Sequence, residues 1–169
     1  MGKRLLSLGA PATGSNNGIT VTGSTNAKPI VVTIGAGHGL IDGDRIRITG
    51  ITGNTNANGD WTLSGVSATT AQLVGSSGND THGGTAVVSV ICDRTPFMAG
   101  KAATVHFGAL WTAGTLLVQG SDDGTTFSTL LTETTAQGGL VREVTLKRYM
   151  KVQGSASTGA GAVNLVASH

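Results

Sequence analysis

Short runs of β-branched and other apolar residues alternate with clusters of glycine, asparagine and aspartate along most of this chain. Between residues 45 and 49 the alternation is strict, Arg-Ile-Arg-Ile-Thr, which predicts a strand with Ile46 and Ile48 facing a core and both arginines facing outward. Turn-forming pairs such as Gly43-Asp44 and Asn58-Gly59 separate the runs. The pattern predicts an all-β chain.

The runs fall into two groups on either side of Pro96. Six short strands at regular spacing in the first group predict a compact barrel, at residues 19–23, 30–34, 45–51, 60–66, 71–74 and 85–91. Six in the second group predict a sandwich or jelly-roll-like unit, at residues 103–107, 114–121, 126–132, 140–146, 149–155 and 162–167. The second group includes a hairpin with an Asp-Gly turn at residues 116–127.

This grouping gives the expected domain organisation. Residues 1–17 combine a basic start, a short apolar patch and a Gly/Ser/Asn-rich end, and are expected to form an extended N-terminal arm. The barrel is expected at 18–91, a linker at 92–100 and the sandwich at 101–169.

Composition and charge narrow the function classes. Charged residues make up 12% of the 169-residue chain, about half the ~25% usual in globular proteins. The net charge of +2 is spread evenly, so no basic face is expected to bind nucleic acid. No apolar run approaches the ~20 residues of a membrane span. The apolar stretch at residues 5–10 is shorter than a signal-peptide core of ~7–15 residues, so synthesis in the cytoplasm without a cleaved signal is expected.

Residues 26–86 carry a recognisable combination of motifs. It runs Pro-Ile-Val-Val-Thr, then Gly-His-Gly-Leu-x-x-Gly-Asp-Arg-Ile-Arg-Ile-x-Gly-Ile, then Asn-Gly-x-Trp-x-Leu, then Ala-Thr-Thr-Ala-Gln-Leu. This combination is similar to the FCCH-like β-barrel module of ubiquitin-activating enzymes, which recurs in virion proteins of tailed bacteriophages. The resemblance implies a barrel and a virion context. It implies no ubiquitin-activating chemistry, because the chain has no room for an adenylation fold.

The second half has a looser resemblance. Its run Gly-Thr-Leu-Leu-Val-Gln-Gly-Ser-Asp-Asp-Gly-Thr-Thr-Phe, followed by Arg-Tyr-Met-Lys-Val, resembles the β-sandwich units of phage structural proteins. It also resembles discoidin-type carbohydrate-binding modules more weakly.

The residues that could carry chemistry have simpler structural interpretations. His38 is expected to cap a turn between strands, and Asp42 and Asp44 to form a hairpin turn instead of a carboxylate cluster with Asp60. The segment 121–125 lacks the full calcium-loop pattern and is interpreted as an Asp-Gly turn. Cys92 is the only cysteine, which leaves a buried structural thiol as the simplest interpretation. We expect no catalytic residues, metal or cofactor, and no enzyme activity.

The sequence therefore indicates a bacteriophage virion structural protein. A capsid decoration (cement) protein that stabilises the head shell is favoured, with a tail, neck or fibre component or a carbohydrate-binding host-recognition module as alternatives. The expected partners are the major capsid protein or other virion proteins and further copies of the chain, for instance as a trimer. The arm residues Lys3, Arg4, Leu5 and Leu6 are candidates for partner binding, and Trp111 is a candidate for surface or glycan contact.

Overall fold

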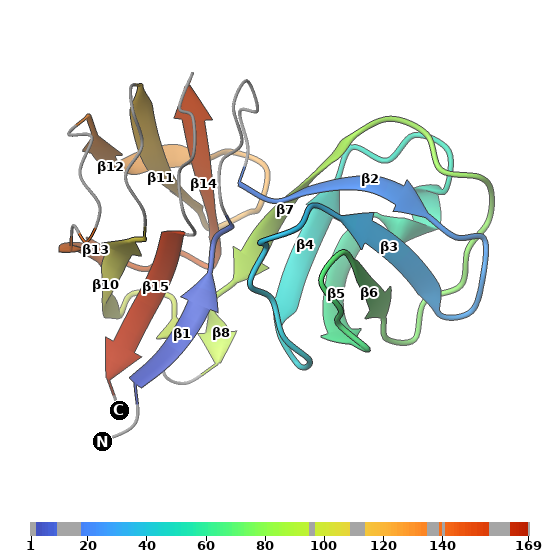
Figure 1. Cartoon of the computed structure of the whole chain (residues 1–169), viewed down its shortest axis with the longest axis horizontal. Coiled ribbons are helices and arrows are strands. Elements are labelled where there is room, and N and C mark those ends of the chain that lie inside the picture. Colours follow the sequence, from blue (N-terminus) through green and yellow to red (C-terminus); the bar gives the residue numbers. More distant parts are fainter. Residues whose placement is uncertain are drawn as a thin grey trace.

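The computed structural model of the chain describes residues 3–9, 18–94, 97–108, 114–134, 139, 141–155 and 163–168. The described residues form an all-β molecule with a barrel at one end and a two-layer sandwich at the other (Figure 1). The predicted fold class is confirmed. In the described part of the chain the one helical element is a 3₁₀ turn, η1 (Thr55–Ala57), and no helix is long and apolar enough to span a membrane.

Six antiparallel strands close the barrel in the order β7-β2-β3-β6-β5-β4, with β4 returning to pair with β7. Ile46 and Ile48 are fully buried, and the arginines on either side of Ile46 point outward, as the alternation predicts. The barrel strands are β2 (Thr20–Ser24), β3 (Ile30–Ile34), β4 (Arg45–Thr49), β5 (Gly59–Ser64), β6 (Thr70–Leu73) and β7 (Ala86–Ile91).

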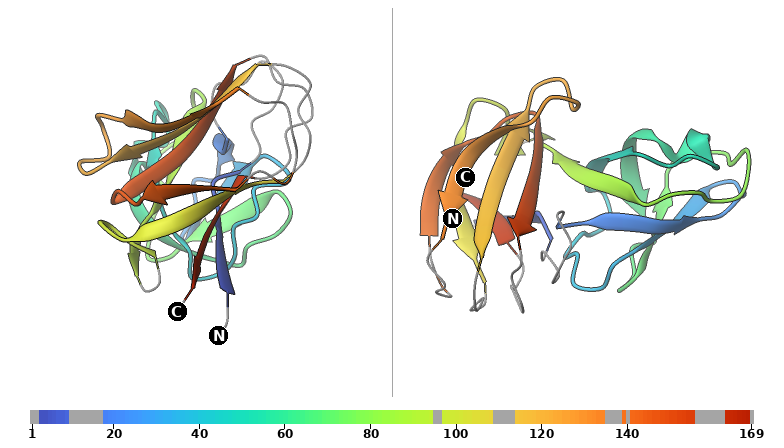
Figure 2. Two further views of the ribbon diagram at one scale, coloured as in Figure 1. Left: turned by 90° about the vertical axis from the view of Figure 1, so that its left-hand side faces the viewer. Right: turned by 90° about the horizontal axis from the view of Figure 1, so that it is seen from above.

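The sandwich has two layers that face each other across an apolar core (Figures 1 and 2). One layer, which we call sheet A, has the order β1-β15-β10-β13, and the other has the order β12-β11-β14. Its strands are β1 (Lys3–Ser7), β10 (Ala102–Phe107), β11 (Thr115–Ser121), β12 (Ser128–Glu133), β13 (Val141–Thr145), β14 (Tyr149–Ser155) and β15 (Val163–Ser168). Arg142 of β13 and the buried Glu133 of β12 form an ion pair of 2.8 Å between the layers.

The N-terminal residues correct the prediction of an extended arm. Residues 3–7 form β1, which pairs antiparallel with β15 from Lys3↔Ser168 to Ser7↔Asn164. Leu6 and Leu8 are 6% and 2% exposed and belong to the core, because alternate residues of an edge strand face inward. The barrel is therefore inserted between the first strand of the sandwich and its remaining strands.

The expected linker also contains structure. Residues 92–100 include a two-stranded hairpin of β8 (Asp93–Arg94) and β9 (Phe97–Met98). Phe97 is buried in the common core, and Arg45 of the barrel forms an ion pair with Asp93. This segment is thus packed against both units.

Strand β7 holds the barrel and the sandwich together. β4 pairs with β7 along Val87–Val90 and occupies one edge of the strand. On the other edge, β2 pairs at Ala86 and Val87, and β14 of the sandwich pairs at Val90 and Ile91. One continuous nine-stranded sheet therefore runs through both units.

A polar cluster reinforces this junction. Arg47 of β4 donates from Nε to Asp60 Oδ1 at 2.5 Å and from Nη1 to the carbonyl of Asp123 in the sandwich at 2.8 Å. The buried Tyr149 of β14 donates to Asp60 Oδ2 at 3.0 Å, and the Arg47 guanidinium lies 4.3 Å from the Tyr149 ring centre. Gly124 has a φ of +76°, and a Cβ there would collide with Arg47, so glycine is required where the loop meets the arginine.

The cluster sets the protonation of Asp60. Burial alone would raise the pKa of this carboxyl, but the hydrogen bonds from Arg47 and Tyr149, together with the charges of Arg47 and Arg148, outweigh burial and lower it. The stabilisation is therefore present above the unfolded-state pKa of about 3.9 and is lost as the pH falls through the lower folded-state value.

The role of β1 can be tested with two neighbouring leucines. Leu6→Ala removes a buried side chain and is expected to lower the free energy of unfolding by about 2–5 kcal/mol. Leu5→Ala changes a side chain that is 60% exposed and is expected to change it by no more than about 0.5 kcal/mol. Urea unfolding followed by circular dichroism measures both. Equal, small effects would show that β1 is not part of the folded sandwich.

The junction can be tested through Asp60. Asp60→Asn is expected to lower the free energy of unfolding by about 1–3 kcal/mol at pH 7, because two hydrogen bonds to a charged acceptor are weakened. The difference from the unmodified chain should begin to shrink below about pH 4, where Asp60 takes up a proton in the unfolded chain, and should be lost once the pH falls below the lower folded-state pKa. Urea unfolding at a series of pH values measures this. Asp122→Asn, in an exposed pair with Lys147, is the control and should cost at most about 1 kcal/mol. If the free energies of unfolding of Asp60→Asn and the unmodified chain differ by the same amount down to about pH 2, the ionised Asp60 does not stabilise the junction.

Candidate interaction surface

The outer face of sheet A is the candidate interaction surface. Leu5 lies opposite Val166, Val166 opposite Thr104, and Thr104 opposite Glu143, so one row of side chains crosses all four strands. Directly paired residues share a face of a sheet. This row points away from the core, because Leu6, Leu165 and Val105, which alternate with it, are buried in the core.

A second row runs beside the first on the same face. Ser7, Asn164, His106 and Val141 are paired in turn across the four strands, but Ser7 is only 3% exposed and does not reach the surface. Val141 is 47% exposed and Leu5 is 60% exposed, so large apolar side chains stand at both margins of the face. Exposed apolar side chains grouped with polar ones are typical of binding surfaces.

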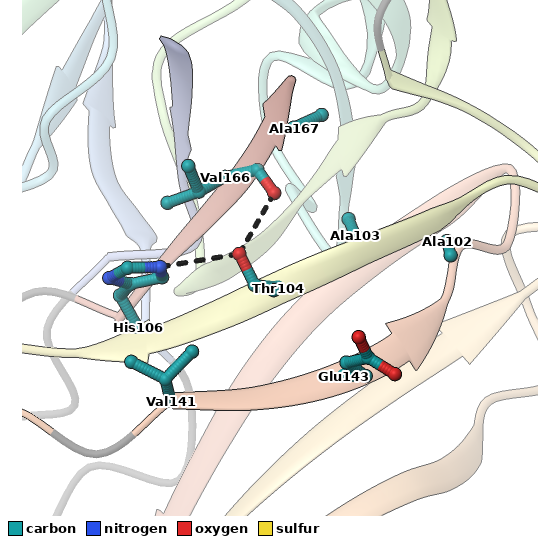
Figure 3. Close-up of a pocket in the computed structure, with 8 residues that line it drawn as sticks. All are labelled: Ala102, Ala103, Thr104, His106, Val141, Glu143, Val166 and Ala167. Atoms are coloured by element: carbon teal, nitrogen blue, oxygen red, sulfur yellow. Dashed lines mark hydrogen bonds between the residues drawn. The ribbon is translucent and has the colours of Figure 1, made fainter.

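Between these margins the face is hollowed. An open depression of about 510 Å³ lies over β15, β10 and β13 (Figure 3). Its walls and floor combine small and apolar side chains with three polar ones, and are formed by Ala102, Ala103, Thr104, His106, Val141, Glu143, Val166 and Ala167. The small residues leave space for a side chain from a partner.

Two of the three polar side chains in the depression, Thr104 and His106, are hydrogen-bonded to each other. The Thr104 hydroxyl donates to the carbonyl of Val166 at 3.1 Å, and His106 Nε2 lies 3.2 Å from Thr104 Oγ1 (Figure 3). The tautomer of His106 decides which of the two groups donates in this second contact. This arrangement orients both side chains as polar contacts on the outer face of sheet A.

The predicted partner-binding residues are divided by the structure. Leu5 lies on the outer face of sheet A, whereas Leu6 points into the core and cannot contact a partner. The backbones of Lys3 and Arg4 lie in β1, and their side chains are outside the described part of the chain. Trp111 lies outside the described residues altogether.

Sequence reasoning missed Thr104, His106 and Glu143. The alternation in residues 102–107 and 141–145 identifies which residues of each strand face outward. It does not reveal that β10 and β13 are neighbours, because strand order depends on contacts between distant segments. The depression follows from that order.

His38 and Asp44 bind local amides, as predicted. The predicted hairpin turn at residues 42–44 is wrong, because this segment joins β3 to β4, which pair with other strands, and Asp42 binds an amide 24 residues away. His38 Nδ1 accepts from the amide of Leu40 at 2.9 Å, and its Nε2 lies 2.9 Å from the carbonyl of Ser67. Asp44 accepts from the amide of Ile41 at 3.0 Å, and Asp42 from that of Val66 at 2.7 Å. Within the described ranges, no three His, Cys, Asp or Glu side chains gather as a metal site.

The Asp-Gly segment is a turn, as predicted. Asp123 Oδ1 accepts from the amides of Thr125 and Thr126 and from the Ser121 hydroxyl, at 2.7–2.8 Å. The donors hold the pKa of Asp123 well below its usual range, with the Thr125 amide contributing most. The Asp123 carboxylate therefore stabilises the loop between β11 and β12.

The single cysteine is shielded from solvent. Cys92 is fully buried beside β7 and belongs to the core. Burial raises the pKa of its thiol to about 12, which disfavours the reactive thiolate.

Comparison of the chain with protein-family models, with curated proteins and with solved structures found no match in any of the three.

The burial of Cys92 predicts its reactivity. At pH 8 a thiol with a pKa of about 12 is ionised in about one molecule in ten thousand. Iodoacetamide is therefore expected to leave the native chain almost unlabelled and to label it fully in concentrated urea, as intact-mass spectrometry would show. Labelling of the native chain at the rate of the unfolded chain would contradict the burial of Cys92.

Proposed function

We propose that this chain is a structural protein of a tailed-bacteriophage virion, and specifically a capsid decoration protein that docks through the outer face of sheet A. The observation that carries this proposal is that face itself. It combines an open depression with Leu5 and Val141, two of the five exposed large apolar side chains in the described part of the chain. The resemblance of residues 26–86 to a module of phage virion proteins supplies the virion context.

The fold supports a role as a passive binding body. Barrel and sandwich share one sheet and one apolar core, so the face is presented on a stiff support. A protein that binds the assembled shell more tightly than free subunits stabilises the shell by mass action. The described chain needs no chemistry of its own for such a role.

The outer face of sheet A is smaller than a typical stable protein interface. Four strands at ~4.8 Å spacing and five residues at ~3.3 Å per residue give a patch of roughly 300 Å². A stable protein interface covers about 800 Å² on each partner. One face alone would bind weakly, so we include self-association, for instance as a trimer, in the proposal, because linked copies bind with higher avidity.

The sheet edges can enlarge the contact. β1 and β13 are the two edge strands of sheet A, and β12 is the edge strand of the opposite layer. An edge strand has unpaired backbone groups that can accept a further strand from a partner. Major capsid protein subunits or neighbouring copies of this chain are the proposed sources of such a strand.

The docking face is tested by Thr104→Arg, which places a long charged side chain in the depression. We expect binding to phage head shells that lack the protein to fall at least about tenfold, equivalent to about 1.4 kcal/mol, without loss of folding. Co-sedimentation with shells measures binding, and the melting temperature checks the fold. Thr33→Arg, at an exposed position on barrel strand β3, is the matched control and should bind as the unmodified chain does.

The outcomes separate the alternatives. Loss of binding with Thr33→Arg and not with Thr104→Arg would move the docking face to the barrel. Immunogold labelling of intact particles on the tail, neck or fibres would replace the decoration role with one of those. A glycan-array signal without shell binding would favour host-surface recognition.

A further inference from the structure

A second depression lies at the junction of the two units, away from sheet A. Its volume is about 310 Å³, and it is bounded by β4 and β7 of the barrel and by β14 and the 122–127 loop of the sandwich. We call it the junction groove and define it by Thr49, Ser89, Thr125, Phe127 and Lys151. Three of these five residues carry hydroxyl groups.

Lys151 gives the junction groove an uncompensated positive charge. Its ammonium lies 4.3 Å from the centre of the Phe127 ring, which holds the side chain against the groove. Within the described residues no carboxylate forms an ion pair with Lys151, whereas Lys147 is paired with Asp122 at 2.8 Å. Burial lowers the pKa of Lys151, so the cation is partly stripped of water without an anionic partner.

The other charges around the junction groove are already satisfied. Arg47 is engaged by Asp60 and by the carbonyl of Asp123. Oδ1 of the Asp123 carboxylate accepts hydrogen bonds from the amides and hydroxyl of its own loop, and no ion pair joins this carboxylate to Lys151. Neither group competes strongly for a ligand placed beside Lys151.

We propose that the junction groove binds a ligand carrying an oxyanion, either a carboxylate or a phosphate, through the ammonium of Lys151. The hydroxyls of Thr49, Ser89 and Thr125 would donate or accept hydrogen bonds at its polar periphery. A groove of about 310 Å³ has room for a group larger than one inorganic ion, since a water molecule occupies about 30 Å³. A small acidic sugar or a phosphate ester has the required size and polarity.

This site is independent of the proposed docking face. It lies between the barrel and the layer of the sandwich opposite sheet A. The proposal therefore stands whether or not the chain decorates a capsid.

The test uses glucuronate, inorganic phosphate and glucose as probes in ¹H–¹⁵N chemical-shift titrations of the full chain at neutral pH. Glucuronate or phosphate is expected to give saturable shifts at residues 124–127 and 151, and uncharged glucose is expected to bind at least about tenfold more weakly than glucuronate. Binding of glucuronate alone would identify a carboxylate ligand, and binding of phosphate alone a phosphate ligand. Saturable binding of both would identify a site for either oxyanion.

Two lysine variants provide the control. Lys151→Met keeps an unbranched apolar stem against Phe127 and removes the charge, and is expected to weaken anion binding about tenfold or more while the chain stays folded. Lys147→Met removes a lysine already paired with Asp122 and is expected to change binding by no more than about twofold. The proposal is overturned if neither anion binds saturably, if glucose binds as tightly as the anion that binds best, or if both variants have the same effect.

Discussion

The structure depends on the two edges of one strand. β4 takes one edge of β7, and β2 and β14 divide the other edge between them. The barrel cannot close without β7, and β14 of the sandwich pairs with the same strand. A rotation of one unit against the other would break hydrogen bonds in the middle of a continuous sheet, and each buried backbone group left unpaired carries a substantial cost. The relative position of the two units is thereby set by backbone pairing before any side chain contributes.

The side chains at the junction act on this fixed geometry. Arg47 is on a barrel strand, Tyr149 is on a sandwich strand, and both bind Asp60 of β5. Because the backbone places these residues within reach, their polar contacts form with little additional ordering. The same placement opens the junction groove, where Lys151 has no comparable carboxylate among the described residues. The boundary between the two units thus contains the Arg47–Asp60–Tyr149 cluster and a lysine ammonium that has no ion-pair partner among the described residues.

The sequence allows most of the strands to be predicted and little of their assembly. Residues 30–34 and 149–155 were identifiable to the residue, because β-branched and aromatic residues alternate between turn formers there. β1 escaped prediction because Leu6 is its one residue assigned to the core and its partner β15 lies at the other end of the chain. Asp60 was similarly ambiguous, since its partner Tyr149 is 89 residues away. The candidate surface could be predicted only as separate outward-facing positions, because the order β1-β15-β10-β13 depends on long-range pairing.

The pairing of β1 with β15 also has a mechanical consequence. Lys3 lies opposite Ser168, so the two ends of the described chain leave the sheet at the same end of one antiparallel pair (Figure 1). Tension applied between these ends would open the backbone bonds one after another, in the manner of a zipper, instead of loading them together in shear. A force transmitted across the broad face of sheet A would act perpendicular to those bonds and leave the ladder closed. The β1–β15 pair is therefore expected to resist load applied across the sheet better than tension applied between these two ends.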